Sequence, residues 1–242
     1  MRLLIKLKDE KKQAIDNSYH KLQGFVYKLM KNDYSSLHDK KGYKFFCFSN
    51  IFPFEENRIR NFIISSPSNE IINSISKNIE IGKLVNIGEM QFRIKEFSIF
   101  NVKIPKRNVH ICCSTPIIIR IPEAKYDKYK IPEEERKARY VYWRPKYSFE
   151  AFLKQLTENL IKKFNDFYGT EISTYDLFEQ FVFKKVVANE LIINGKAYPV
   201  IGSIWEFIWH NMDSMQRKII EFGLDTGFGE RNSFGFGFVN VV

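Results

Sequence analysis

One histidine in a polar segment is the residue of this sequence best suited to acid–base chemistry. His38 lies in SSLHDKKGY, and Gly42 follows it closely. An unperturbed imidazole titrates near neutrality, so it can accept a proton from a hydroxyl group and return one to a leaving oxygen. A loop on a rigid scaffold is a common place for such a residue. A lone loop histidine is more often exposed and idle, so a role for His38 requires support from its neighbours.

Two further side chains lie near His38 in the sequence and complete a candidate catalytic set. On a helical wheel Tyr27 falls away from the apolar stripe that includes Leu22 and Phe25, so the core does not require it. Lys44 precedes an apolar run and can hold negative charge that develops on a phosphate. A surface tyrosine and a solvated strand-end lysine are the ordinary alternatives. One histidine cannot be both base and acid without a partner, and the sequence does not assign the two roles.

Metal chemistry finds little support in the sequence. His38 and Asp39 resemble the HD pair of metal phosphohydrolases, but such enzymes need further histidines at suitable spacing. His110 and Cys112 share one face of an expected strand, yet they supply two ligands where a structural zinc site needs four. We therefore interpret these two as core residues and expect neither a metal nor another cofactor.

The composition indicates a soluble globular protein with an affinity for polyanions. Lysine and arginine number 38 against 28 acidic residues, a net charge of +10, and the excess is larger in residues 1–105, with 18 basic and 11 acidic groups. Such a charge suits nucleic acid or an anionic membrane surface. Three cysteines make no disulfide framework, and neither a signal-peptide core nor a membrane span is evident, so we expect a cytoplasmic protein without membrane contact.

A glycine-rich segment near the end of the chain is a candidate phosphate-binding loop. Glycine lets a backbone approach a ligand closely and aim N–H groups at phosphate oxygens. A dinucleotide fold requires such glycines between a first strand and a helix, whereas only a short strand remains here. A turn that merely packs is the structural alternative. Because the loop is polar and carries an arginine, we expect it to contact RNA through Gly227, Gly229, Arg231, Asn232, Ser233, Gly235 and Gly237.

A second basic segment, residues 120–147, interleaves lysine and arginine with tyrosine and tryptophan. Basic groups neutralise phosphates, and aromatic faces stack on unpaired bases at about 1–3 kcal/mol for each base. Three consecutive glutamates, residues 133–135, interrupt the segment, and a solvated loop over a sheet has a similar composition. The sequence leaves RNA contact and a solvated loop equally open.

The hydrophobic patterns predict an α+β protein. The first part shows the order β-α-β-β-α-β of a ferredoxin-like domain, with strands at 2–7, 44–52, 58–65 and 91–100 and helices at 18–31 and 68–78. The same plan recurs more weakly in the second part, with a strand at 108–122 broken at Pro116, helices at 149–168 and 211–224, and a hairpin at 180–209. We predict two tandem ferredoxin-like (RRM-like) domains, residues 1–105 and 106–242.

Four segments together resemble one known family. KLQGFVYKLM at 21–30, LHDKKGYKFFCFSNIF at 37–52, STPIIIR at 114–120 and GFGERNSFGFGFV at 227–239 follow the order and spacing of the CRISPR-associated repeat endoribonucleases, the sixth Cas family of the RAMP superfamily. Each motif alone is weak, but the set is specific. The resemblance extends from the first expected helix to the last strand, and the middle of each domain matches only in pattern.

The resemblance implies a chemistry and its residues. The family has two ferredoxin-like domains and cleaves repeat RNA to a 2′,3′-cyclic phosphate and a 5′-hydroxyl, often with a tyrosine, a histidine and a lysine, which correspond to Tyr27, His38 and Lys44. The implied partners are CRISPR repeat RNA and other CRISPR subunits, and the sequence leaves open whether two copies of the chain form a homodimer. The alternative is a non-catalytic RNA-binding RAMP subunit of an interference complex, which shares fold, charge and glycine loop but does not require these three residues.

Overall fold

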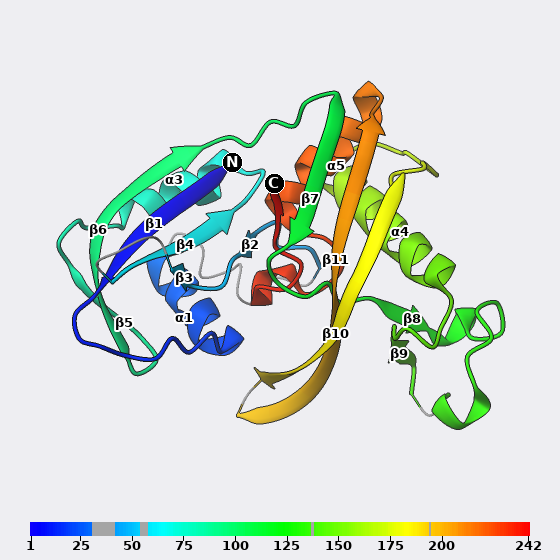
Figure 1. The fold of residues 1–242 in the computed structure, drawn as a ribbon, viewed down its shortest axis with the longest axis horizontal. Coiled ribbons are helices and arrows are strands. Elements are labelled where there is room, and N and C mark those ends of the chain that lie inside the picture. Colours follow the sequence, from blue (N-terminus) through cyan, green and yellow to red (C-terminus); the bar gives the residue numbers. More distant parts are fainter. Residues whose placement is uncertain (31–41, 54–57, 137, 194) are drawn as a thin grey trace.

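Two antiparallel sheets, each with two helices packed on one face, make up the computed structural model, which describes residues 1–30, 42–53, 58–136, 138–193 and 195–242. The first sheet has the order β2-β4-β1-β6-β5, with β3 beside β4, and α1 and α3 pack on it (Figure 1). Its elements are β1 (Arg2–Asp9), α1 (Tyr19–Met30), β2 (Cys47–Phe48), β3 (Phe52–Pro53), β4 (Ile59–Ser65), α3 (Asn69–Lys77), β5 (Leu84–Ile87) and β6 (Met90–Phe100).

The second sheet has the order β10-β11-β7-β12, and α4 and α5 pack on it. A separate two-stranded ribbon, β8 with β9, stands beside it. The elements are β7 (Arg107–Cys113), β8 (Arg120–Pro122), β9 (Tyr140–Tyr142), α4 (Phe149–Tyr168), β10 (Gln180–Ile193), β11 (Lys196–Asn211), α5 (Ser214–Thr226) and β12 (Val239–Val241), with 3₁₀ turns η2 (Glu123–Lys125), η3 (Glu133–Glu135) and η4 (Asn232–Phe234).

Local sequence explains most of these elements. Leu3, Ile5 and Leu7 alternate along β1 and are fully buried, as a strand with one covered face requires. Ser68 begins α3, because its hydroxyl accepts a hydrogen bond from the Ile71 amide. Asp213 begins α5 in the same way, so that this helix starts later than the predicted residue 211. The predicted helices at 18–31, 68–78 and 149–168 are confirmed within one or two residues.

Two strand predictions are corrected. The run 44–52 forms only the short β2 and β3, and Phe45 before them has a left-handed φ of 50°, which a continuing strand does not allow. The predicted strand at 91–100 is β6, but β5, its hairpin partner, was not predicted, although Gly82 and Gly88 flank β5 with positive φ. The predicted strand at 108–122 ends at Cys113, and Ile117 and Ile118 then form single bridges before β8 begins.

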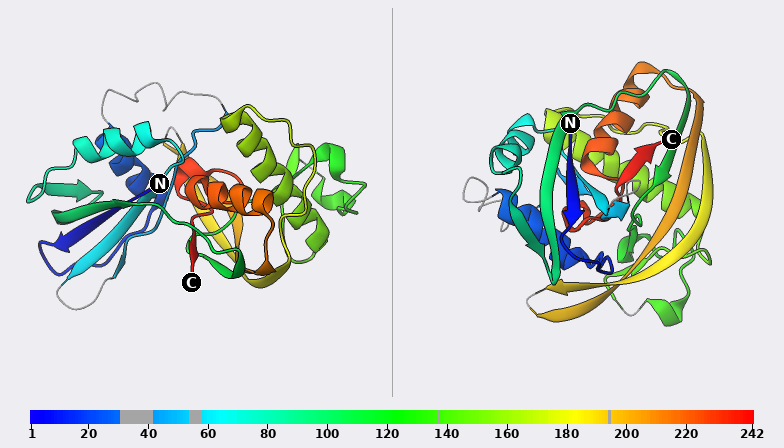
Figure 2. Two further views of the ribbon diagram at one scale, coloured as in Figure 1. Left: turned by 90° about the horizontal axis from the view of Figure 1, so that it is seen from above. Right: turned by 60° about the vertical axis from the view of Figure 1, so that its left-hand side comes forward.

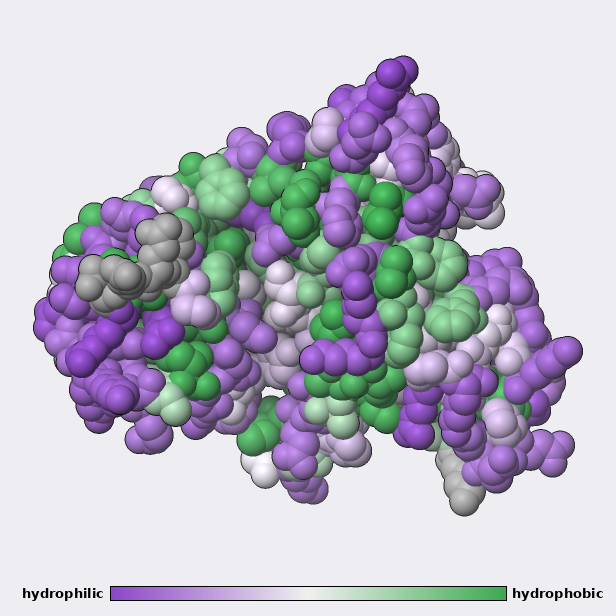
Figure 3. Space-filling model, in the orientation of Figure 1, coloured by the Kyte–Doolittle hydropathy of each residue, from purple (hydrophilic) through white to green (hydrophobic). Residues whose placement is uncertain are grey.

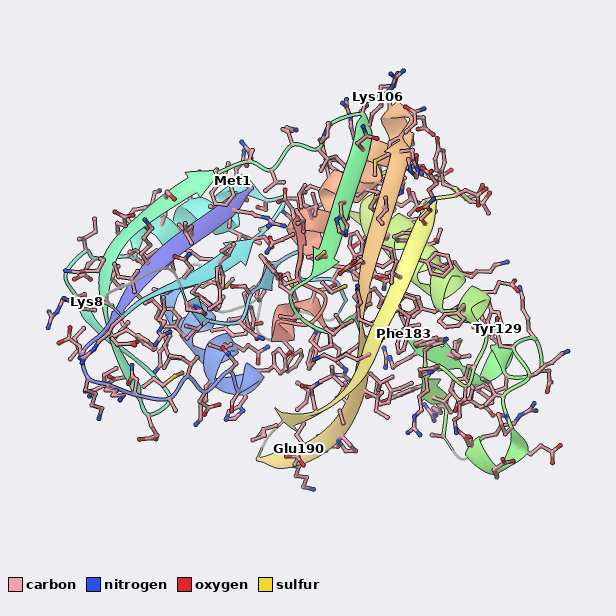
Figure 4. The ribbon with its side chains drawn as sticks, viewed as in Figure 1. Met1, Lys8, Lys106, Tyr129, Phe183 and Glu190 are labelled. Atoms are coloured by element: carbon pink, nitrogen blue, oxygen red, sulfur yellow. The ribbon has the colours of Figure 1, made fainter. Side chains whose placement is uncertain are left out.

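The aromatic residues of segment 120–147 are largely a core, which argues against base stacking there. Tyr126, Tyr129, Trp143 and Tyr147 are each at most 5% exposed, and Tyr129 is labelled in Figure 4. The Trp143 ring lies 5.3 Å from the Trp205 ring of β11. Of this segment's rings only Tyr140 and Tyr142 are partly exposed, so the hypothesis of an extended stacking surface is not supported.

The two sheets face the same way. Their strands lie in front of the helices in Figure 1, and Figure 2 shows the helices along one side of the molecule and the strands along the other. Buried Arg2 links the two parts, since its guanidinium donates to the carbonyls of Leu224 (2.9 Å) and Val239 (2.7 Å). Among the described helices, none combines the length and the hydropathy that a membrane span needs.

Candidate functional site

Two of the three predicted catalytic residues meet in the structure. The Lys44 ammonium donates to the Tyr27 hydroxyl over 3.2 Å and lies 5.7 Å from the centre of the Tyr27 ring. The ring itself packs edge-on against Phe46, at 5.9 Å between centroids. Helix α1 therefore presents Tyr27 to Lys44, three residues before β2. The third predicted residue, His38, lies in segment 31–41, outside the described residues.

The glycine-rich loop is built around a buried lysine. Lys163 of α4 is 2% exposed, and its ammonium donates to the carbonyls of Gly227 (2.5 Å) and Gly229 (3.2 Å) and to Oδ1 of Asn232 (3.0 Å). Burial lowers the pKa of Lys163 to about 7. The three oxygen acceptors favour the protonated amine, which has one N–H for each of them. The loop is thus fixed from within by the amino group of one buried lysine.

Asn232 completes this internal scaffold. While its Oδ1 accepts from Lys163, its Nδ2 donates to the carbonyls of Phe228 (3.1 Å) and Phe236 (2.9 Å). The amide side chain bridges the two arms of the loop, and its oxygen and both of its N–H groups form hydrogen bonds within the protein. We therefore assign Asn232 a structural role, whereas the sequence placed it among the RNA contacts.

The glycines of the loop are required by packing, as in the structural alternative of a turn that packs. A Cβ on Gly237 would lie 1.9 Å from the carbonyl oxygen of Phe228, and one on Gly235 would lie 2.5 Å from the Phe48 ring. The amides of Gly227, Gly235 and Gly237 each donate to a protein carbonyl over 2.8 Å. These three N–H groups are consequently not offered to a phosphate.

Helix α1 holds the loop beside the Tyr27–Lys44 pair. Gln23, one helical turn before Tyr27, donates through Nε2 to the Ser233 carbonyl over 2.9 Å. One turn earlier still, the Tyr19 ring lies 4.1 Å from that of Phe236. A single face of α1 thus carries both the contact to the loop and the candidate catalytic tyrosine.

A cavity of about 580 Å³ opens between the start of β2 and the glycine loop. Arg231 enters it from the loop, with a left-handed φ of 57° and a buried Nε that makes no hydrogen bond to a described residue. Arg120 is paired with Glu230 and lies 4.6 Å from the Tyr140 ring, so its charge is already neutralised. The lining residues include Gly42, Tyr43, Lys44, Phe46, Arg120, Asn159, Lys163, Gly229, Glu230, Arg231, Ser233 and Phe234.

Sequence reasoning missed Lys163 as part of this site and placed Arg120 only in the basic segment 120–147, apart from the glycine loop. A signal for Lys163 was present, because it lies three residues after Leu160 and seven after Leu156, on the buried stripe of α4. A lysine at such a position needs buried acceptors. Arg120 gave no comparable signal, since its partner Glu230 is 110 residues away.

His110 and Cys112 share one face of β7 as predicted, but they are not core residues. Val109 and Ile111 point into the core, so His110 and Cys112 lie on the open face of the sheet, where both are partly exposed. Neither lines the cavity beside Lys44.

Three comparisons with known proteins agree with one another. The family model described as CRISPR associated protein Cas6, C-terminal, matches residues 99–241. A CRISPR-associated endoribonuclease Cas6 2 from Methanocaldococcus jannaschii is 27% identical over the whole of both chains. A solved structure of a CRISPR associated protein Cas6 is 25% identical, with a TM-score of 0.70 over 100% of this chain and 99% of that one. A RAMP protein described as binding different RNA substrates shares the fold, with a TM-score of 0.72 at 22% identity over 100% and 99% of the two chains.

Proposed function

Since the chain belongs to the Cas6 family of CRISPR-associated endoribonucleases, we propose that it binds CRISPR repeat RNA and cleaves precursor transcripts without a metal ion. The ribose 2′-OH beside the scissile phosphate attacks that phosphate and leaves a 2′,3′-cyclic phosphate and a 5′-hydroxyl. The observation that carries the proposal is the Lys44–Tyr27 hydrogen bond at the edge of a cavity lined by basic groups. Other CRISPR subunits and a second copy of the chain remain predicted partners.

The proposed architecture is a tandem of two ferredoxin-like domains, residues 1–105 and 106–242. The support is that both sheets have the same order of their four main strands, with the second, third, first and fourth strands of the unit side by side. In the first unit these are β2, β4, β1 and β6, and in the second β10, β11, β7 and β12. In each unit one helix follows the first strand and another follows the third, which is the β-α-β-β-α-β plan.

In the proposed mechanism three side chains have separate roles at the scissile phosphate. Lys44 stabilises negative charge on the phosphoryl oxygens as the 2′-oxygen attacks. Tyr27, held by Lys44, orients the 2′-OH or the leaving 5′-oxygen through its hydroxyl. His38, four residues before Gly42 of the cavity wall, transfers a proton to or from one of these oxygens.

For RNA binding we assign the direct contacts of the loop to Arg231 and Ser233. Arg231 lines the cavity, and its guanidinium carries the N–H donors that bind a phosphate or a base edge there. Ser233 lines the same cavity, and only its carbonyl is used by Gln23. The glycines and Asn232 act indirectly, by fixing the path of the backbone that carries these two residues.

The central test is cleavage of a CRISPR repeat RNA by the His38→Ala variant. We expect the rate to fall by about 10²–10⁴-fold with little change in RNA affinity, because one neutral imidazole adds little to binding. Tyr27→Phe and Lys44→Ala should slow cleavage less. The control is His210→Ala, which removes a histidine that pairs with Glu179 and does not line the cavity. A His38→Ala protein that cleaves at the parental rate contradicts the assignment.

The mechanism is tested by changing the substrate. A single 2′-deoxy substitution at the nucleotide before the scissile phosphate should block cleavage and preserve binding, because the phosphates and base faces are unchanged. An excess of EDTA should not slow cleavage of the unmodified RNA. An enzyme with two catalytic metals would cut the deoxy strand and fail in EDTA. Cleavage of the deoxy substrate at the normal position would refute attack by the 2′-OH.

The second candidate function is a non-catalytic RNA-binding subunit of an interference complex. It predicts tight binding of repeat RNA and no cleavage by the parental protein in the same assay. The Tyr27–Lys44 contact favours the nuclease, because binding alone does not require a hydroxyl and an ammonium held together.

The loop assignment is tested by Arg231→Ala. Loss of one phosphate contact should weaken binding similarly for all RNA sequences and reduce the slope of log affinity against log salt by about 0.7–0.9. The matched control is Arg93→Ala, since Arg93 is an exposed arginine paired with Glu10, away from the cavity. Equal affinity of the Arg231→Ala and parental proteins would leave the loop with a packing role alone.

A further inference from the structure

Three side chains of metal-ligating types meet on the open face of the second sheet. His110 and Cys112 lie two residues apart on β7, and Glu206 of β11 is the direct cross-strand partner of Cys112. One ligand atom from each of the three lies within 4.8 Å of those of the other two. The pairing of two strands therefore supplies a third ligand that the spacing on β7 alone does not indicate.

The distances suit a tetrahedral zinc ion. Sγ of Cys112 lies 3.5 Å from Nε2 of His110, and this nitrogen lies 3.5 Å from Oε2 of Glu206. With Zn–S of about 2.3 Å and Zn–N and Zn–O of about 2.0–2.2 Å, tetrahedral angles place sulfur and nitrogen about 3.5 Å apart and nitrogen and oxygen about 3.4 Å apart. Two of the three separations therefore match those that an ion between the side chains requires, and the third, between Cys112 and Glu206, is within 4.8 Å.

The donor set also selects the class of ion. Thiolate and imidazole favour zinc and cobalt, whereas magnesium and calcium prefer sites made of oxygen alone. Lys184 binds the other carboxylate oxygen, Oε1, of Glu206 over 2.9 Å, and so orients the carboxylate with Oε2 toward His110. Such outer contacts are typical of metal ligands.

We propose that His110, Cys112 and Glu206 form a binding site for a divalent transition-metal ion of the Zn²⁺ class on the open face of the second sheet. The three protein ligands leave a fourth position, which faces outward because the His110 side chain is 37% exposed and that of Glu206 is 28% exposed. Water or a phosphate oxygen occupies it. None of the three residues lines the cavity beside Lys44, so the ion has no part in the proposed cleavage.

The open face is accessible to such an ion in the free protein. β7 and β11 lie at the front of the molecule in Figure 1, and no helix lies over them from this side. Figure 3 shows hydrophobic residues gathered over the second sheet on this face. Val182 of β10, the cross-strand partner of Glu206, is 41% exposed. The ligands thus border an apolar surface, where a cation–ligand bond competes less with water.

The test is titration of the full-length protein, carrying no histidine tag and freed of metal by a chelator, with Co²⁺. We expect one equivalent of Co²⁺ to produce the d–d absorption of a tetrahedral site and a thiolate-to-cobalt charge-transfer band, and one equivalent of Zn²⁺ to remove both. Cys112→Ser should abolish the charge-transfer band, and His110→Ala and Glu206→Gln should each weaken Co²⁺ binding by at least about 10-fold.

Two matched variants serve as controls. Cys113→Ser changes the neighbouring cysteine, which packs toward the core, and His210→Ala changes a histidine on the same sheet that lies outside the cluster. Both should keep the charge-transfer band and the affinity for Co²⁺. A band that survives in Cys112→Ser, or the absence of a saturable one-to-one signal in the parental protein, overturns the proposal. Neither result changes the outcome expected from the cleavage assay with EDTA. The proposed metal site and the proposed cleavage mechanism are therefore tested independently.

Discussion

Replacing Lys163 with methionine tests whether the buried amino group of this lysine holds the glycine loop together. The substitution keeps the length and the apolar stem of the side chain and removes only the ammonium. Three oxygens then lose their donor: the carbonyls of Gly227 at 2.5 Å and Gly229 at 3.2 Å, and Oδ1 of Asn232 at 3.0 Å. The variant therefore isolates the electrostatic part of the scaffold from its packing.

The expected magnitude is a balance of two terms. A hydrogen bond from a charged donor contributes about 1.5–3 kcal/mol, so the three bonds together contribute about 4.5–9 kcal/mol. Against this stands the cost of burying the ammonium, which lowers the pKa of Lys163 from 10.5 to about 7. Because this cost offsets most of the gain, we expect Lys163→Met to lose only about 2 kcal/mol of stability at pH 7, the size of one or two hydrogen bonds.

The assay is urea unfolding of Lys163→Met beside Lys162→Met, followed by circular dichroism. Lys162 precedes Lys163 on α4 and is exposed, so its replacement should change the free energy of unfolding by less than about 0.5 kcal/mol. Lys163→Met should also bind repeat RNA more weakly, because the backbone that carries Arg231 loses its support. Equal stability of the two variants would refute the idea that the ammonium holds the loop.

Three further predictions concern stability. The pKa of Lys163 is about 7 in the folded protein and 10.5 in the unfolded chain, so between these pH values only the unfolded chain holds the extra proton. The stability of the parent relative to Lys163→Met should therefore rise with pH in this window, by about 1.4 kcal/mol per pH unit. Urea unfolding curves at pH 7 and pH 9 that give the same difference between the two proteins would contradict this. Gly237→Ala should destabilise the protein by more than about 3 kcal/mol, because it adds a collision with the Phe228 carbonyl to the cost of a positive φ. Gly195→Ala, with a similar φ and open space around it, should cost only about 1–2 kcal/mol. Similar melting temperatures of the two variants would exclude the collision. Gly24→Ala in α1 has open space and an ordinary φ, so it should stabilise by about 0.5–1 kcal/mol, and a lowered melting temperature would show a contact that we have not identified.

Much of the fold follows from local sequence. The alternation of Leu3, Ile5 and Leu7 predicts β1, and the apolar stripe from Leu22 onward predicts α1, because a side-chain period of two or of 3.6 residues is visible without any partner. Ser68 predicts the start of α3 through a hydrogen bond within three residues of the chain. β5 was missed, since its residues are mostly exposed and show no periodic burial.

The candidate site was predictable only in part. Tyr27, His38 and Lys44 were chosen as a set from the sequence, but only the fold places the Lys44 ammonium 3.2 Å from the Tyr27 hydroxyl. The glycine loop was recognised from its composition, but the sequence did not show that its glycines pack against the protein itself. A run of glycines indicates close approach of the backbone to some neighbour, and the sequence does not say whether that neighbour is a ligand or, as at Gly237, another stretch of the same chain.

What the sequence by itself determined is therefore most of the helices and strands and the types of residue available for chemistry. What only the tertiary structure decided is which of these residues meet. Lys163 reaches the loop across 64 residues of chain, and Glu206 reaches Cys112 through the register of two strands. Such contacts depend on the packing of whole elements, because the register of a sheet and the docking of a helix are fixed by the entire buried surface rather than by the residues in contact.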